Sequence, residues 1–381
     1  MQRETSPSGI LEWILANARP TASNAAAVRF ESRADPGASR LPGIHVPPDP
    51  RNPDHWRERG RLYDFAAAVE GAARVLDIGP GEGWPSLPLA AHVKEVIGIE
   101  PGAHRLAACR ANARQLGVRK ARFERMSACR MAFPDASFDA VVAADSLEQT
   151  ADPAAALREA FRVLVPGGVL RMSYEVSEAQ PEPAAEALRV RETAAGVYEI
   201  DYTIRWRDSG IERGLVLEVR PASPARAARL AACAKRCRAD GSPLRDPRLE
   251  RGLRGTVTGL AREEIRGARS YTVRHFRSDA LLRALARTGF ENARLVVGGG
   301  RIADSLARAL LRSRRIAAAA PLMDDLCRAA GAIGIALSTE NPGEVIARKP
   351  SGSRLSAAKG AQGGRARRGS PHASRAKGGP A

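Results

Sequence analysis

The sequence predicts a doubly wound α/β fold, in which a mostly parallel sheet has helices on both faces and a smaller α+β unit is inserted after its fifth strand. Three observations predict it. Short apolar runs alternate with helical segments between residues 73 and 176. A glycine-rich turn follows the first of these runs. A period-two pattern of apolar and polar residues then interrupts the alternation.

Composition favours a folded protein outside the membrane. The chain has 381 residues, of which 44% are hydrophobic, enough for one large domain or two smaller ones. No apolar run approaches the roughly 20 residues that a membrane helix needs. Residues 10–16 (ILEWILA) lack the basic start and the cleavage site of a signal peptide. We therefore expect a cytoplasmic protein.

The two ends of the chain differ from its middle. Residues 1–60 are rich in Pro, Asp, Arg and Gly and are predicted as an irregular lead-in with a helix near 9–17. The net charge of +18 lies partly in residues 351–381, which hold seven basic residues and no acid. Gly, Ser and Ala fill most of the rest, so the tail is predicted to be disordered. It is either a solvated tail of biased composition or an arm that contacts nucleic acid.

Residues 61–350 are predicted to form the α/β domain. Apolar runs predict buried strands at 73–79, 95–101, 120–126, 137–148 and 166–176. Helices are predicted at 61–71, 84–93, 104–118 and 152–164, the last with Asp152 as N-cap and Pro153 at its first position. A helix at 277–290 and strands at 293–299 and 343–350 complete a seven-stranded sheet.

Residues 177–270 interrupt this alternation and are predicted to be an insertion that covers the domain as a lid. Alternate residues from Tyr198 to Trp206 are apolar, and the pattern resumes from Leu215 to Val219 after the turn RDSG. Such alternation predicts an antiparallel hairpin with one buried face. A basic helix is predicted at 224–238. We expect the insertion to shape a pocket for a small molecule.

The stretch VLDIGPGEG (75–83) is the first candidate ligand site. Glycines after a buried strand let backbone N–H groups approach a ligand closely. A dinucleotide site spaces its glycines G-x-G-x-x-G, whereas Gly79, Gly81 and Gly83 are two apart throughout. Asp77 precedes them, and a carboxylate is a poor neighbour for a pyrophosphate but suits an amine or another cation. The turn therefore favours a ligand with a cationic end.

Glu100 is the second candidate, because it ends the second strand, 17 residues after Gly83. A carboxylate there can accept two hydrogen bonds from a ribose diol. An amine or cation at one end and a ribose at the other describe S-adenosylmethionine. With VIGIEP, SFDAVVAADSLEQ and DPAAALREAFRVLVPGGVLRMS following in order, residues 73–175 resemble the class I S-adenosylmethionine-dependent methyltransferases of the small-molecule, methyltransferase type 11-like kind, whose sheet is Rossmann-like.

The resemblance implies a role for each matched residue. The methionine part of S-adenosylmethionine would meet Asp77 and the backbone of Gly79, Gly81 and Gly83. The ribose would meet Glu100, and the adenine would pack on Pro101. Asp145 closes the fourth strand, where methyl donor and acceptor should meet.

One position departs from the family pattern. The family commonly places an acid after the third strand, where it bonds the adenine amino group. This sequence has Ser127 and Ala128 there. The resemblance then implies either a weaker, neutral hydrogen bond from Ser127 or a contact through the backbone N–H of Ala128.

Methyl transfer from a sulfonium is an in-line displacement, which rests largely on positioning and desolvation. A general base is needed only where the nucleophile arrives protonated. The candidates are His275, Tyr271 and Glu148, with a packing role as the alternative for His275. A small-molecule acceptor is favoured because DSLEQ (145–149) replaces both the Asn/Asp-Pro-Pro-aromatic pattern and the Pro-Cys nucleophile of base methyltransferases.

Two alternatives stay open. The first is a nucleic-acid-associated methyltransferase that uses the basic tail and the arginines of 226–238. The second is a non-catalytic binding module that kept the fold. No metal site is expected, since Cys233 and Cys237 lie one helical turn apart without a neighbouring His or second Cys pair. The acceptor and the oligomeric state are left open by the sequence.

Overall fold

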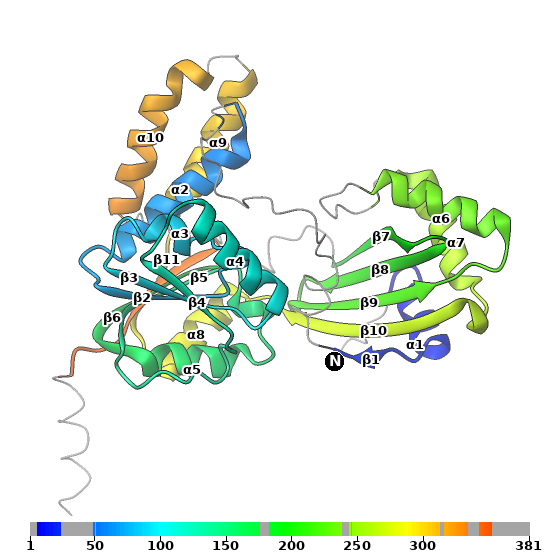
Figure 1. Cartoon of the computed structure of the whole chain (residues 1–381), viewed down its shortest axis with the longest axis horizontal. Coiled ribbons are helices and arrows are strands. Elements are labelled where there is room, and N and C mark those ends of the chain that lie inside the picture. The colour runs from blue at the N-terminus through cyan, green and yellow to red at the C-terminus, as the bar shows by residue number, and fades with distance from the viewer. Residues whose placement is uncertain are drawn as a thin grey trace, which may run out of the picture.

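The computed structural model describes residues 6–23, 49, 51–175, 183–237, 244, 246–312, 316–333 and 343–352. They form two sheets that lie side by side (Figure 1). The larger has seven strands in the order β11-β12-β6-β5-β2-β3-β4, and the smaller has five in the order β1-β10-β9-β8-β7. The predicted α/β class and the seven-stranded sheet are confirmed.

The seven-stranded sheet has a parallel centre and one antiparallel strand. Its parallel strands are β2 (Arg74–Ile78), β3 (Glu95–Ile99), β4 (Ala121–Glu124), β5 (Phe138–Ala144) and β6 (Leu164–Ser173). Strand β12 (Glu344–Arg348) runs antiparallel to β6, and β11 (Glu291–Leu295) runs antiparallel to β12. The carboxyl ends of β2, β3, β5 and β6 therefore meet at one edge of the sheet, which we call the carboxyl edge.

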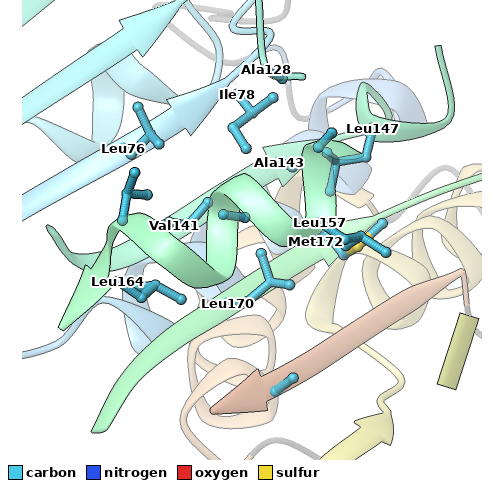
Figure 2. Close-up of a cluster of buried hydrophobic side chains, with 14 of the residues drawn as sticks. Leu76, Ile78, Ala128, Val141, Ala143, Leu147, Leu157, Leu164, Leu170 and Met172 are labelled. Atoms are coloured by element: carbon cyan, nitrogen blue, oxygen red, sulfur yellow. The ribbon is translucent and has the colours of Figure 1, made fainter. Parts of the chain in front are cut away.

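Helices cover both faces of this sheet because neighbouring residues of each strand are both apolar. Leu76 faces a core with α5 (Pro153–Val163) and α8 (Ser278–Thr288), as Figure 2 shows for α5. Val75 faces the opposite core, with α2 (Pro53–Ala68), α3 (Ser86–Leu89) and α4 (Ala103–Gln115). Helix α5 begins where predicted: the carboxylate of Asp152 accepts a hydrogen bond from the N–H of Ala155 at 3.0 Å.

The five-stranded sheet is larger than the hairpin predicted from the sequence. Strands β7 (Ala184–Ala194), β8 (Val197–Trp206), β9 (Ile211–Val219) and β10 (Ile265–Arg274) pair antiparallel. Helices α6 (Pro224–Arg236) and α7 (Pro247–Thr258) cover its apolar face, which carries Tyr202 and Leu217. The unit thus extends to Arg274, four residues beyond the predicted insertion boundary.

Residues 10–22 belong to this second unit: the helix predicted near 9–17 is confirmed, and it packs on the five-stranded sheet and is not part of an irregular lead-in. Helix α1 (Ile10–Asn17) buries Ile10, Leu11 and Ile14 against the apolar face of the five-stranded sheet. Strand β1 (Thr21–Ala22) then pairs parallel with β10 at the sheet edge. Local sequence did not reveal this packing, because the residues that α1 contacts lie more than 170 positions further along the chain.

Helix α2 begins at Pro53, eight residues before the predicted helix, because its first turns have a partner of their own. It packs against α9 (Gly299–Arg312) and α10 (Ile316–Ile333), which the sequence did not predict and which project from the domain with it (Figure 1). Trp56 is buried in this small core. A Cβ on Gly60 would lie 2.4 Å from the backbone of Gly299, so the two helices approach closely.

The fourth strand of the sheet is shorter than predicted. Strand β5 ends at Ala144 and not at residue 148, and the 3₁₀ turn η2 (Leu147–Gln149) follows it. Asp145 between them has a φ of 50°, a value that only a few per cent of non-glycine residues adopt. None of the helices in the described ranges is long and apolar enough to cross a membrane.

The core between α5 and the sheet gives a stability prediction. Leu157 on α5 is only 1% exposed, because it packs against the apolar strand residues drawn in Figure 2. Leu157→Ala is expected to lower the free energy of unfolding by about 2–5 kcal/mol, because it removes buried methyl groups and leaves a cavity. Urea titration followed by circular dichroism measures this. Arg158→Ala on the exposed face of the same helix should stay within about 0.5 kcal/mol of wild type; equal losses would contradict the packing described.

Candidate active site

The glycine turn has the backbone conformation that its sequence requires. Gly79, Gly81 and Gly83 have φ values of 72°, 61° and 122°, in the region that favours glycine. The turn also has close neighbours. A Cβ on Gly79 would lie 2.7 Å from that of Ser146, and one on Gly81 would lie 3.3 Å from the guanidinium of Arg105. The end of β5 and helix α4 thus fix the shape of the turn.

Asp77 is fully buried at the start of this turn. Its Oδ2 accepts hydrogen bonds from the backbone N–H of Ser86 at 3.0 Å and from the Ser86 hydroxyl at 2.6 Å, which ties β2 to the first residue of α3. Its Oδ1 has no hydrogen-bond partner among the described residues. Burial raises the pKa of Asp77 to about 7, although the bonds from Ser86 oppose this shift. The carboxyl therefore shapes the turn and keeps one oxygen for a donor.

Glu100 lies at the carboxyl end of β3, as predicted, and is 4% exposed. Its Oε1 accepts a hydrogen bond from the N–H of Gly102 at 3.0 Å, which fixes the carboxylate at the N-terminus of α4. Pro101 beside it is exposed. In the segment after the neighbouring strand β4, Ser127 is exposed and Ala128 is buried, so a ligand can reach the two predicted adenine contacts to different extents.

Asp145 is part of a contact that the sequence did not predict. Arg61 of α2 donates hydrogen bonds to Asp145 Oδ2 at 2.6 Å and to the hydroxyl of Ser173 at 2.7 Å, and its guanidinium lies 4.7 Å from the ring centre of Trp84. Burial lowers the pKa of Arg61, but the carboxylates of Asp145 and Glu58 outweigh it and hold that pKa above its usual value. Asp145 keeps 46% of its side chain exposed. A cation and an acid thus lie together at the carboxyl edge.

A cavity of about 250 Å³ lies where the two sheets meet. One wall is the end of η2 with residues 149–151, directly after the carboxyl end of β5. The other wall is β10 with residues 270–272, together with Ala22 and Ser23. Tyr271 lines it, and its ring lies over Gly214, where a Cβ would come within 2.0 Å of the ring. The insertion thus forms one side of a pocket beside the carboxyl edge.

The structure brings the three candidate catalytic residues to this junction. Glu148 Oε1 accepts a hydrogen bond from the backbone N–H of Glu175 at 3.1 Å. Glu175 Oε2 lies 3.5 Å from His275 Nδ1, and His275 Nε2 lies 3.2 Å from Glu212 Oε2. Of the three candidates, Tyr271 lines the cavity, while Glu148 and His275 bind residues that join the two sheets.

Comparison with known proteins assigns the central segment. Residues 76–172 match the family model described as a methyltransferase domain. This match confirms the resemblance to the class I S-adenosylmethionine-dependent methyltransferases, with S-adenosylmethionine as their cofactor. The segment that contains the glycine turn, Glu100 and Asp145 therefore matches a methyltransferase domain.

Two curated relatives align over this region. The chain is 36% identical over 164 residues to the 27-O-demethylrifamycin SV methyltransferase of Amycolatopsis mediterranei, which covers 40% of this chain and 60% of that protein. It is 41% identical over 118 residues to the demethylmenaquinone methyltransferase of Deinococcus radiodurans, covering 29% of this chain and 48% of that one. The chain thus spans about half the length of these relatives.

Among solved structures, the S-adenosylmethionine-bound amino pentose methyltransferase CalS10 of Micromonospora echinaspora aligns over 77% of this chain and 91% of its own. The sequence identity is 16% and the TM-score is 0.41.

The site residues fit S-adenosylmethionine. Asp77 Oδ1 is a buried acceptor with no partner among the described residues, and it lies on the strand directly before the glycine turn. Glu100 holds a carboxylate at the end of the neighbouring strand, and Asp145 and Arg61 present an anion and a cation at the end of the third strand. Acids along one edge suit the amine, the sulfonium and the ribose diol, while a guanidinium suits a carboxylate.

The sequence did not predict Arg61 as a site residue, nor its contact with Trp84. Arg61 is 18 residues before Gly79, the first glycine of the turn, and has no local pattern of its own. Its i,i+3 spacing from Glu58 is the one sequence signal for this residue, because the spacing places both side chains on one face of a helix.

The arginines predicted to contact nucleic acid are partly used in contacts within the protein, since Arg226 binds Glu264 and Arg229 donates to the Thr256 hydroxyl. Residues 353–381 of the basic tail lie outside the described residues.

Glu148 gives a pH prediction. Burial, followed by the charge of Asp145, raises its pKa to about 8 from 4.5. The folded chain therefore keeps a proton that the unfolded chain loses, so stability falls as pH rises between about 5 and 8, by up to about 1.4 kcal/mol per unit. Glu148→Gln removes this contribution. Unfolding titrations at several pH values should show a shallower fall than wild type, with Glu291→Gln, on the exposed end of β11, as the unchanged control.

Proposed function

We propose that this protein is an S-adenosylmethionine-dependent methyltransferase that acts on a small-molecule acceptor. The observation that supports this most is the arrangement at the carboxyl edge. A row of acids suited to the cofactor lies at the ends of three neighbouring strands, and the cavity between the sheets opens beside the last of them. The two curated relatives, whose names specify a rifamycin and a menaquinone precursor, are consistent with a small-molecule acceptor.

On the cofactor side, each residue has a distinct role in this proposal. Glu100 accepts hydrogen bonds from both ribose hydroxyls. Asp145 accepts from the methionine ammonium, and Arg61 donates to the methionine carboxylate. Asp77 holds the turn in place through Ser86, so that the backbone N–H groups of the glycines face the ligand.

On the adenine side, the proposal relies on backbone and packing. Pro101 packs on the ring, and the N–H of Ala128 replaces the acid that the family commonly has at this position. Ser127 is exposed, so a hydrogen bond from its hydroxyl has to compete with water.

When bound, the cofactor supplies an electrophilic methyl group on a sulfonium. The protein's part is then to orient the acceptor and to keep water out. Tyr271 lines the cavity and is the candidate that meets the acceptor or takes its proton. Glu148 and His275 act through other groups: they hold Glu175 and Glu212 and thereby position the β10 wall.

Cofactor binding tests the ribose contact. Calorimetric titration of wild type with S-adenosylmethionine and S-adenosylhomocysteine should show binding, and Glu100→Ala should weaken it by about 1–3 kcal/mol, the range for a hydrogen bond to a charged group. Glu95→Ala is the matched control, since Glu95 lies at the opposite end of the same strand. A folded wild type that binds neither ligand would overturn the methyltransferase proposal in favour of a binding module that kept the fold.

The role of Arg61 has its own test. Arg61→Gln should weaken S-adenosylhomocysteine by about 1–3 kcal/mol and leave 5′-methylthioadenosine unchanged, because the second ligand has no carboxylate. Glu100→Ala should weaken both ligands. Arg57→Gln, four residues earlier on α2 and 44% exposed, is the control. Equal losses for the two ligands in Arg61→Gln would assign Arg61 to the fold of the site and not to the methionine carboxylate.

A further inference from the structure

The cavity between η2 and β10 has a wall made of strand edge. Strand β1 pairs with β10 as far as Ala22 and Ser270, and Ser23 N–H donates to Ser270 O at 2.8 Å. Beyond that bond no described residue pairs with β10 on this side. Residues 271 and 272 continue the strand along the cavity. The cavity therefore lies where no described residue pairs with this side of β10.

The register shows which backbone groups face this cavity. Ser270 O points toward β1, whereas His275 N–H donates to Gly210 O on the β9 side at 2.8 Å. Backbone groups of alternate residues point to opposite sides of a strand. Thr272 therefore has the parity of Ser270, and both its N–H and its C=O point away from β9, toward the cavity. Among the described residues nothing pairs with these two groups, so this strand edge offers a donor and an acceptor to a ligand.

The side chains around this edge carry no formal charge. The described lining residues contribute hydroxyls, an amide and methyl groups, and they are Ala22, Ser23, Gln149, Thr150, Ala151, Ser270, Tyr271 and Thr272. The charged residues at the junction lie outside this lining. Arg205 donates to Glu212 at 2.9 Å and to Glu175 at 2.5 Å. A charged ligand would therefore lose its hydration here without meeting an opposite charge.

We propose that the methyl acceptor binds in this cavity as a neutral, hydroxyl-bearing molecule that pairs with the N–H and C=O of Thr272. The inference rests on the proposed methyltransferase function and names its substrate class. A hydroxyl matches the strand edge because it donates to the C=O and accepts from the N–H. A carboxylate cannot donate to the C=O, and its charge has no partner in the lining. Tyr271, fixed over Gly214, forms the wall beside the hydroxyl.

Resorcinol and 3-hydroxybenzoate test this, because they differ only in a hydroxyl that a carboxylate replaces. Binding of each is measured by ligand-observed NMR at pH 7, with and without saturating S-adenosylhomocysteine. Wild type should bind resorcinol about tenfold more tightly than 3-hydroxybenzoate. Ala151→Trp, from an exposed position on the cavity wall, should weaken resorcinol by about tenfold or more by filling the space, while the affinity for S-adenosylhomocysteine stays unchanged.

Two further variants complete the experiment. Ala232→Trp adds the same side chain on the exposed surface of α6 and should bind both probes as wild type does. Thr272→Pro removes the N–H from the free edge and should weaken resorcinol even where the fold is intact. Equal binding of the two probes, no binding of resorcinol, or unchanged binding in Ala151→Trp would each overturn the inference. If wild type does not bind S-adenosylhomocysteine, the result counts against the proposed function instead. The two failures can be told apart because binding of the probes is also measured without S-adenosylhomocysteine.

Discussion

The contacts of Arg61 join three elements at the end of the site where the methionine carboxylate is proposed to bind. Its guanidinium joins helix α2 to the carboxyl ends of β5 and β6, through Asp145 and Ser173, and it stacks on Trp84 at the end of the glycine turn. Because Arg keeps its charge at any ordinary pH, the residue needs an acid nearby when it is shielded from water. Asp145 supplies it from the end of β5, where its backbone has a positive φ.

A buried network lies behind Arg61 and explains why α2 holds its position. Asp64, one turn further along α2, accepts hydrogen bonds from the N–H groups of Gly299 and Gly300, the first residues of α9. Arg171 on β6 pairs with Glu344 on β12. Burial raises the pKa of Asp64 and of Glu344, that of Glu344 to about 7. A helix terminus is thus capped by an acid from the helix that carries Arg61, so α9 and the site are connected through a single element.

A feature could be predicted from the sequence where residues close together in the chain determine it. The glycine turn, Glu100 and Asp145 lie on strands whose apolar runs are short, continuous and separated by recognisable helices, so their placement needs no distant contact. Arg61 could not be found in this way, because its partners are 84 and 112 residues away. The full five-stranded sheet was missed for the same reason: β10 is separated from β9 by two helices, and α1 comes from the other end of the chain. Helices α9 and α10 were missed since their apolar faces pack on the distant helix α2 and on each other.

The junction of the two sheets shows why the acceptor cavity is neutral although the chain is rich in arginine. Arg205 bridges Glu175, which follows β6, and Glu212, which lies on β9, and the imidazole of His275 lies between the same two acids. Removing Arg205 would take a cation away from the buried carboxylate of Glu212, so these groups are committed to holding the sheets together. The charges that could bind an ionic acceptor are used in this joint. What is left for the cavity is hydroxyls and a strand edge, which select a ligand by hydrogen bonds and not by charge.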